Sequence, residues 1–336
     1  MWYATNDRNL YGDGGYQGAL SALPLITMPP PLITFTSDYG LEDEYVGSVK
    51  GVLHGLCPGA AIVDLTHFIE PQDVEAGAWL LRAAFESFPD GAVHLAVVDP
   101  GVGGPRRAIA ARTRRAFWVG PDNGLFSGVF DRDGPAAVVE IDRRRFLRPS
   151  PSTTAPAPIA ALAAATFDGR DLFAPAAAWL ANGRPLRSLG RPLTRWVRLP
   201  EEAPRTVRVF GPMKGRAGRR SSDRSSSRLG ERRERVRLQG RVVRVDRFGN
   251  LITNIDVEQL AGVVGGAGGA RRTPRLAVSV GRRRVELFRY YDEAECGSVG
   301  ALINSSGYLE IFGTHGSAFE RLGLGKGATV TVESVP

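Results

Sequence analysis

The stretch TFDGRDLFAP at residues 166–175 places two aspartates, Asp168 and Asp171, on either side of a Gly-Arg pair. Carboxylates at this spacing can accept a proton from a reacting group or attract a cation, and they can equally be solvated charges of a surface loop. The choice between an active-site segment and a surface loop depends on whether other reactive groups reach the same place.

Three more aspartates follow runs of apolar, strand-forming residues, namely Asp38 in TSDYG, Asp99 in VVDPGVGG and Asp122 in GPDNG. A single aspartate at a strand end is most often a turn-former or a helix cap. Because the carboxyl ends of parallel strands lie at one edge, and because nearby glycines let the backbone approach closely, three of them predict a shared pocket. We predict that Asp122 and the adjacent Asn123 bind the substrate.

The sequence motifs for nucleotide, metal and covalent chemistry are incomplete. GVGGPR lacks the third glycine of a dinucleotide fingerprint, and GLGKGAT lacks the spacing and the Ser/Thr of a phosphate loop. The four histidines show no paired ligand spacing, so we expect no metal. FTSDYG has no glycine before its serine and is therefore not a nucleophile elbow. A pocket of carboxylates, glycines and arginines remains, which suits a cationic substrate that is already activated.

The first half of the chain alternates between strand and helix patterns. Strand-like runs occupy 32–38, 61–66, 93–99 and 116–122, and apolar residues at helical spacing occupy 44–56 and 74–88. This alternation predicts an α/β domain with a mainly parallel sheet and flanking helices.

The second half contains short β-runs separated by Gly-rich turns, which predicts a smaller antiparallel β-barrel-like domain. We place the N-terminal α/β domain at 31–190 and the C-terminal β domain at 191–336. Residues 1–30 lack periodicity and are expected to form a flexible extension, with Met28 as an alternative start.

The formal net charge of +8 is concentrated in one stretch, because residues 214–237 carry ten Lys/Arg against three Asp/Glu. A Ser/Arg/Gly stretch buries too little apolar surface to order itself, so we predict a disordered insertion at 214–236. A polyanion-binding arm is the alternative, but the stretch has no aromatic residue on which a base could stack. We therefore expect no nucleic-acid partner.

Two cysteines rule out a disulfide framework. No apolar run approaches the ~20 residues of a membrane helix, and the N-terminus lacks the basic start and apolar core of a signal peptide. We expect a cytoplasmic protein that does not contact a membrane.

Seven long motifs together resemble the S-adenosyl-L-methionine (SAM) hydroxide adenosyltransferases, relatives of the SAM-dependent fluorinase and chlorinase. In chain order they are TFTSDYGLEDEYVGSVKG, AIVDLTH, VVDPGVGGPRRAI, VGPDNGLFS, TFDGRDLFAPAAAWL, VDRFGNLITNI, and NSSGYLEI followed by GSA. The resemblance implies a homotrimer in which SAM, the substrate, lies between the N-domain of one subunit and the C-domain of its neighbour. It implies no cofactor.

The resemblance also implies roles for individual residues. Asp38 matches the residue that binds the ribose hydroxyls. Asp246 and Asn250 of DRFGN match the ligands of the methionine amine and of the adenine side.

Two further matches lie near the C-terminus. Ser305 and Ser306 of NSSG match the segment that holds the methionine carboxylate. Tyr291 is a candidate for stacking on adenine, and a half-buried strand aromatic is the alternative interpretation of this residue.

The hydroxide-transferring members of that family carry an Asp-Arg-His triad beside the water, and Asp99 and Arg106 match its first two positions. The third should stand in TFHGRD, but the motif here reads TFDGRD, so Asp168 replaces the histidine. Repulsion between two carboxylates beside one arginine favours a proton on one of them, which could then act as the base. The opposite outcome is a pocket that binds but turns over little.

The leading hypothesis is hydrolysis of SAM to adenosine and methionine by in-line attack of water on ribose C5′, with Asp99, Arg106 and Asp168 as catalytic residues. A catalytically weakened SAM- or adenosine-binding protein is the alternative, and Asp168 is the reason for it. Halide transfer ranks lower, because a second negative charge at the nucleophile position is hostile to chloride and fluoride.

Overall fold

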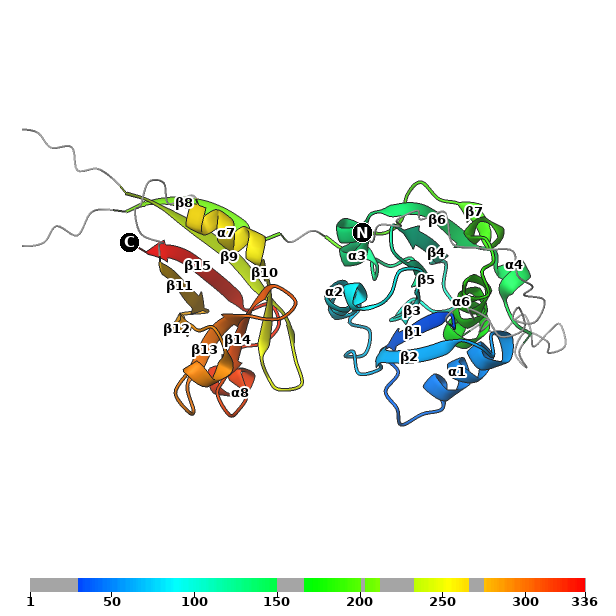
Figure 1. Ribbon diagram of the computed structural model, residues 1–336, viewed down its shortest axis with the longest axis horizontal. Helices are drawn as coiled ribbons and strands as arrows, with labels where there is room; N and C mark the ends of the chain where they lie inside the picture. The colour runs from blue at the N-terminus through cyan, green and yellow to red at the C-terminus, as the bar shows by residue number, and fades with distance from the viewer. Residues whose placement is uncertain (1–29, 150–165, 201–202, 212–232, 266–274, 336) are drawn as a thin grey trace, which may run out of the picture.

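The computed structural model describes residues 30–149, 166–200, 203–211, 233–265 and 275–335, which form two lobes (Figure 1). The predicted extension 1–30 lies outside the described residues except for its last residue. The predicted insertion lies outside them up to residue 232, and its last four residues belong to a strand of the second lobe.

The N-terminal lobe is built on a seven-stranded sheet in the order β2-β1-β3-β5-β4-β6-β7. Its strands are β1 (Leu32–Ser37), β2 (Ala61–Thr66), β3 (Val93–Val97), β4 (Ala108–Thr113), β5 (Phe117–Pro121), β6 (Pro135–Ile141) and β7 (Gly190–Pro192). β2, β1, β3 and β5 pair in parallel, whereas the pairings of β4 with β5 and β6, and of β6 with β7, are antiparallel. The predicted α/β class is confirmed, with a mixed sheet whose parallel half holds the predicted strands.

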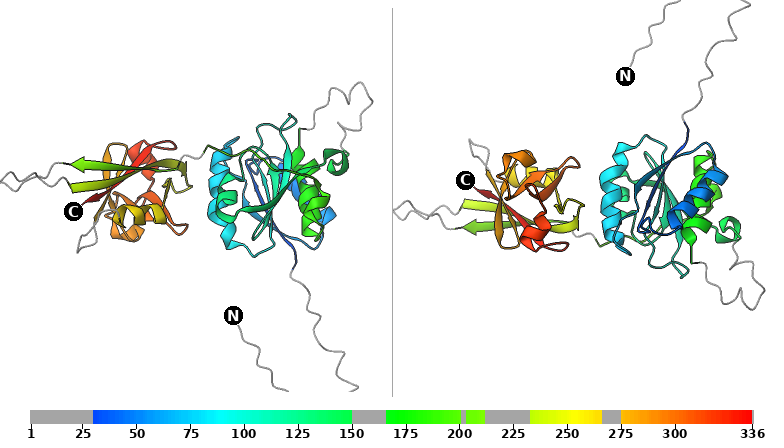
Figure 2. Two further views of the ribbon diagram at one scale, coloured as in Figure 1. Left: turned by 90° about the horizontal axis from the view of Figure 1, so that it is seen from above. Right: turned by 90° about the horizontal axis from the view of Figure 1, so that it is seen from below.

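Helices cover both faces of this sheet (Figure 2). They are α1 (Tyr45–Leu56), α2 (Val74–Ala84), α3 (Ser127–Asp133), α4 (Arg143–Phe146), α6 (Ala174–Ala181), the 3-10 turns η1 (Phe85–Ser87) and η3 (Leu186–Ser188), and the π-helical turn η2 (Gly169–Phe173). α1 and α6 share one core with the sheet, and α2 and α3 share the core on the opposite face. Helix α1 buries Val46, Val49 and Leu53 against the sheet.

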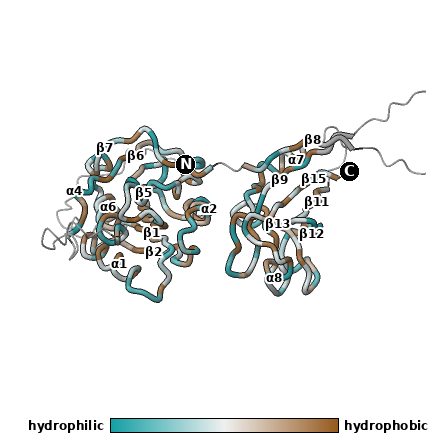
Figure 3. The backbone as a smooth tube through the Cα atoms, turned by 180° about the vertical axis from the view of Figure 1, so that it is seen from behind, coloured by the Kyte–Doolittle hydropathy of each residue, from teal (hydrophilic) through white to brown (hydrophobic). Residues whose placement is uncertain are grey.

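The apolar residues of the lobe gather on the central strands (Figure 3). Ile33, Phe35 and Trp118 have no exposed surface, and burying a side chain of this size stabilises the fold by about 1.5–3 kcal/mol. His94 belongs to this core, because its ring stacks on Trp118 at 4.3 Å between centroids. Burial lowers the pKa of His94 to about 4, so this histidine is a neutral core residue rather than a ligand.

The C-terminal lobe is a closed barrel of seven strands, as the β-runs predict. Its strand order is β10-β14-β13-β12-β11-β15-β9, the β9–β10 pairing closes the ring, and β8 adds to the outer edge of β9. The elements are β8 (Arg205–Gly211), β9 (Arg233–Val245), β10 (Leu251–Asp256), α7 (Val257–Gly265), β11 (Arg275–Val280), β12 (Arg283–Leu287), η4 (Tyr291–Glu293), β13 (Val299–Ile303), β14 (Tyr308–Gly313), α8 (Ala318–Leu322) and β15 (Thr329–Val335). All pairings are antiparallel except β12–β13.

The two lobes contact each other through α2. The ring of Trp79 packs edge-on against Tyr308, with 5.5 Å between the centroids. Lys326 donates to Asp73 at 2.6 Å and lies 3.2 Å from Glu75. An aromatic contact and an ion cluster therefore join the barrel to the first lobe. None of the helices that the structure describes is long and apolar enough to cross a membrane.

Candidate active site

Arg106 lies between two aspartates that are distant in sequence. Its Nε donates to Asp99 Oδ1 at 2.8 Å, and its Nη2 donates to both Asp99 Oδ2 and Asp168 Oδ2, the latter at 2.5 Å. The side chains are nearly buried, with exposed fractions of 5% for Asp99, 11% for Arg106 and 0% for Asp168. The structure thus brings the three predicted catalytic side chains together.

The loop between β3 and β4 supplies Asp99 and Arg106 from opposite ends. Gly101 lies inside this loop, and a Cβ there would stand 3.2 Å from Arg106 Cγ and 3.9 Å from Asp99 Oδ1. Glycine therefore leaves room for the arginine to fold back onto the aspartate at the end of β3.

Asp168 lies much later in the sequence, immediately before the π-helical turn η2. Leu172 and Phe173 anchor this turn in the core without exposed surface. The guanidinium carbon of Arg106 stands 5.3 Å from the centroid of Phe173. π-Helical turns are rare and are often found at functional sites, and here the turn directs a buried carboxylate toward the arginine.

A second arginine, which sequence analysis missed, also holds Asp168. Arg143 at the start of α4 donates from Nη1 to Asp168 Oδ1 at 3.0 Å and from Nη2 to Oδ2 at 2.5 Å. The three consecutive arginines 143–145 have no spacing that singles out the first, so the sequence carried no signal for this contact.

The charges of this cluster balance. Burial alone would lower the pKa of Arg106, but hydrogen bonds and charges from Asp99 and Asp168 outweigh burial and raise it above the usual value. Arg106 therefore stays cationic. The expectation of two carboxylates repelling each other beside one arginine omitted Arg143, which supplies the second positive charge.

Tyr39 is the second residue that sequence analysis missed. Its hydroxyl points at η2, because a Cβ added to Gly169 would stand 2.4 Å from Tyr39 Oη. Burial raises the pKa of Tyr39 above its ordinary value. The negative charges of Asp38, Asp99 and Asp168 raise it further. The phenol is therefore neutral and lies beside both the Arg106 cluster and Asp38.

Replacing Tyr39 with phenylalanine tests this placement through the pH dependence of stability. Because the pKa is raised only in the folded state, the unfolded tyrosine ionises first, above a pH of about 10. Tyr39→Phe should therefore gain unfolding free energy relative to the parent above about pH 10 and show a constant difference below it. Urea unfolding of both proteins at pH 8 and pH 10.5 measures this. An equal difference at both values would place Tyr39 in solvent.

Asp38 lies at the edge of this cluster. Its Oδ2 accepts a hydrogen bond from the backbone N–H of Gln72 at 2.8 Å. The preceding Ser37 is buried and its Oγ shares a 2.7 Å hydrogen bond with His67 Nδ1. Burial lowers the pKa of His67, more than Asp64 raises it. A neutral, buried Ser-His pair therefore fixes the backbone that presents Asp38.

The side chains of Asp122 and Asn123 form hydrogen bonds with backbone groups of the first lobe. Asp122 is 4% exposed and accepts from Arg107 Nε at 2.7 Å and from the N–H of Val197 at 2.8 Å. The Asn123 amide donates to the Val98 carbonyl at 2.8 Å. These contacts hold the β5 end and the segment after β7, and they do not join the Arg106 cluster. A substrate contact by either residue stays a prediction.

The predicted C-domain residues form a second set. Asp246 Oδ1 accepts from the N–H groups of Phe248 and Asn250, each at 2.9 Å, and the Asn250 side chain donates to Asp246 Oδ2 at 3.2 Å. Ser305 and Ser306 lie on an exposed turn between β13 and β14.

Tyr291 belongs to the same set. Its hydroxyl donates to Glu310 Oε1 at 2.7 Å, while its side chain remains 48% exposed. Glu310 is buried, and burial raises its pKa despite hydrogen bonds from Tyr291 and Asn304. The ring of Tyr291 therefore has a fixed tip and an accessible body, a geometry that is suited to stacking.

Each set is flanked by exposed apolar side chains. In the part of the chain that the structure describes, no hydrogen bond or ion pair links the Arg106 cluster to the Asp246 set. Leu41 and Phe68 are 56% and 65% exposed beside the first set, and Phe248 and Tyr290 are 78% and 54% exposed beside the second. Each set thus resembles one wall of a site that another surface completes.

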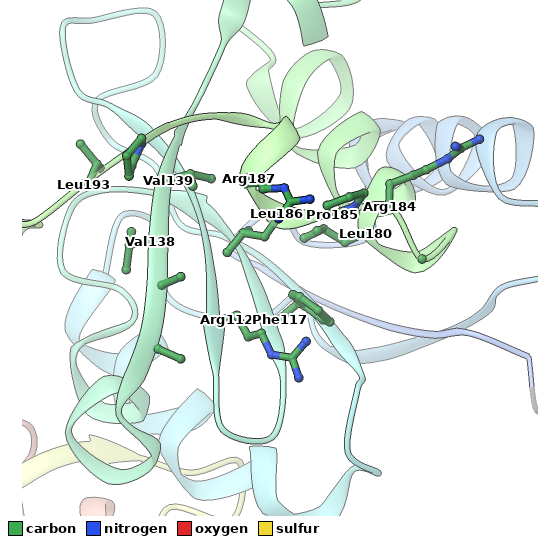
Figure 4. Close-up of a pocket in the computed structure, with 14 residues that line it drawn as sticks. Arg112, Phe117, Val138, Val139, Leu180, Arg184, Pro185, Leu186, Arg187 and Leu193 are labelled. Atoms are coloured by element: carbon green, nitrogen blue, oxygen red, sulfur yellow. The ribbon is translucent and has the colours of Figure 1, made fainter.

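A pocket of about 640 Å³ lies elsewhere on the first lobe (Figure 4). Arg112, Phe117 and Leu186 are among its lining residues, which include none of the predicted site residues. Its position on the β6 side of the sheet separates it from the Arg106 cluster.

Comparisons with known proteins cover both lobes. Family models described as the SAM hydroxide adenosyltransferase N-terminal and C-terminal domains match residues 33–190 and 240–331. A curated relative from Thermus thermophilus named (R)-S-adenosyl-L-methionine hydrolase is 41% identical over 302 residues, which cover 89% of this chain and 98% of the relative.

Two more relatives extend the comparison. A fluorinase from Actinoplanes sp. is 28% identical and covers 90% of this chain and 97% of its own length. The crystal structure of an uncharacterized conserved protein from Thermotoga maritima has a TM-score of 0.70 and 29% identity, covering 89% of this chain and 99% of its own. Both similarities include the two lobes.

Proposed function

Because the chain belongs to the SAM hydroxide adenosyltransferase family, we propose that it is a hydrolase that converts SAM and water into adenosine and L-methionine. The observation that carries the proposal is the buried Asp99–Arg106–Asp168 cluster at the carboxyl end of the parallel half of the sheet. The proposed reaction requires no cofactor, since the sulfonium of SAM is already a good leaving group.

In the reaction, the oxygen of a water molecule attacks C5′ of the ribose in line with the C5′–S bond, from a distance of about 3–3.5 Å. As the C–O bond forms, the C5′–S bond breaks and its electron pair returns to sulfur, which leaves as the thioether of methionine. The proton of the attacking water passes to a carboxylate and then to solvent.

One nitrogen of Arg106 is available to donate a hydrogen bond to this water. Its Nη1 is buried and has no hydrogen-bond partner among the residues that the structure describes. A guanidinium N–H aimed into a low-dielectric site stabilises the negative charge that develops on an attacking oxygen. Asp99 and Asp168, which accept from the other two nitrogens of Arg106, are the groups within reach of the proton.

The charge of the wall fits the substrate. Asp38, Asp99 and Asp168 carry three negative charges against two on Arg106 and Arg143, and Tyr39 is neutral. This leaves one net negative charge to attract a sulfonium that carries one net positive charge.

The second wall comes from another subunit in this proposal, and the protein is a homotrimer with sites at its interfaces. Asp246 and Asn250 would then bind the amine and adenine, and Ser305 and Ser306 the methionine carboxylate. The exposed Phe68 beside the first set and the exposed Phe248 beside the second support an interface, because subunit contact would bury both side chains.

The test uses ¹⁸O-labelled water. Purified protein incubated with SAM should release adenosine and methionine in equal amounts, and mass spectrometry should find the label in the 5′-hydroxyl of adenosine and not in methionine. Added chloride should leave the products unchanged. SAM that stays bound without adenosine would instead identify a binding protein, and a 5′-chloro nucleoside would identify a halide transferase.

A further inference from the structure

We propose that Arg143 is a positioning residue of the water site, which holds the Asp168 carboxylate in the orientation that lets Arg106 face the water. This inference rests on the proposed function. It concerns a residue outside the three that are expected to contact the reacting water.

The geometry supports a fixed carboxylate. Both oxygens of Asp168 accept from the fork of Arg143, at 3.0 and 2.5 Å, and the side chain has no exposed surface. A bidentate arginine–carboxylate pair fixes orientation as well as charge. Only one oxygen, Oδ2, is shared with Arg106. Arg143 therefore occupies the second oxygen and prevents Asp168 from turning to form its own bidentate pair with Arg106.

The backbone holds Arg143 in place. The short helix α4 is capped at its N-terminus by Asp142, whose side chain accepts from the N–H of Arg144 at 3.0 Å. At its other end the N–H of Arg148 donates to the carbonyl of Asp171 at 2.8 Å. The helix is thus tied to the turn that carries Asp168, and the pair spans two anchored segments.

Arg143 also supplies the second positive charge of the cluster. Without it, Asp99 and Asp168 would share the single guanidinium of Arg106. With it, two guanidiniums serve the two carboxylates, since Asp168 accepts from both Arg143 and Arg106, and the Nη1 of Arg106 has no hydrogen-bond partner among the described residues. The side chain of Arg143 is 34% exposed and therefore reaches the protein surface, whereas that of Asp168 has no exposed surface.

The experiment measures steady-state adenosine release by the parent and five variants of the full-length chain. Arg143→Gln should lower kcat by about 10- to 100-fold with little change in KM, because misplacement of catalytic groups affects the transition state more than binding. Arg143→Lys, which keeps the charge but not the fork, should recover part of kcat.

Three variants complete the test: Arg144→Gln, Asp168→Asn and the double variant Asp168→Asn/Arg143→Gln. Arg144→Gln removes the same charge from the same helix at an exposed position and should leave kcat and KM unchanged. In an Asp168→Asn background, Arg143→Gln should have no further effect on kcat, because its partner is already neutral.

The failures are distinguishable. A parent that releases no adenosine overturns the proposed function and this inference together. If the parent is active, the inference alone is overturned when Arg143→Gln matches Arg144→Gln in kcat, or when the losses from Arg143→Gln and Asp168→Asn multiply.

Discussion

Replacing Arg106 with methionine is expected to lower kcat for adenosine release by about 10³-fold, the loss typical of removing a charged donor from a developing oxyanion. Methionine removes the guanidinium, which lies over the Phe173 ring, and with it the three nitrogens that serve Asp99, Asp168 and the water. Steady-state adenosine release measures the effect. KM should change far less than kcat, since the lost interaction is made mainly in the transition state.

The same variant should be less stable, because Asp99 loses its cation while remaining 5% exposed, whereas Asp168 keeps Arg143. Removing one partner of a buried pair typically costs about 3–5 kcal/mol. Arg112→Met, on the exposed side of β4, is the matched control and should retain activity and stability. An Arg106→Met protein that is folded and within tenfold of parental kcat would remove the cluster from the mechanism.

The second large effect is recovery of activity by mixing two inactive variants. Arg106→Met disables the N-domain wall, and Ser306→Glu disables the C-domain wall by placing a carboxylate on the exposed turn that is expected to hold the substrate carboxylate. Each alone should lose at least about 10²-fold in kcat/KM. In a mixed trimer with sites between neighbours, one site in three combines two intact walls, so activity should return to about one third of the parent.

Co-expression with two different affinity tags and sequential purification isolates the mixed assemblies, and light scattering gives their mass. Mixtures of each variant with a second copy of itself, carrying the other tag, are the controls and should stay inactive. Mixed assemblies that stay inactive would place both walls of each site in a single chain. A monomeric mass would remove the trimer from the proposal.

The fold was predictable where local patterns matched long-range packing. Strand runs at 32–38 and 61–66 became β1 and β2, and the helical spacing after Glu44 became α1. The strands β4 and β6 were missed because AIAART and PAAVVEI carry too few β-branched residues at alternate positions to stand out. Their pairing is antiparallel and depends on neighbours in space rather than on βα alternation.

The site was predictable to the extent that strand ends and motifs defined it. Asp38 and Asp99 could be placed together because the carboxyl ends of parallel strands lie at one edge of a sheet. Asp168 is too distant in sequence for any periodicity to place it there, and only the TFDGRD motif indicated it. Arg143 could not be found, because a charged residue in a run of three is ordinary on a helix surface. Asp122 stands at a strand end like the others, but its carboxylate is taken by Arg107 and a backbone N–H.

The contacts of the segment after β7 have a practical consequence for anyone who wishes to excise the first lobe. The N–H of Val197 is bound by Asp122 and that of Leu199 by Ser127, each at 2.8 Å. Leu199 also packs so tightly on Gly124 that a Cβ there would stand 2.9 Å from its Cγ. A fragment trimmed at residue 190, where the match to the N-terminal family model ends, would remove one donor, the N–H of Val197, from the buried Asp122 and would uncover Gly124. A fragment of the first lobe should therefore end after Pro200. The contacts of the chain with this lobe extend about ten residues beyond the end of the family match.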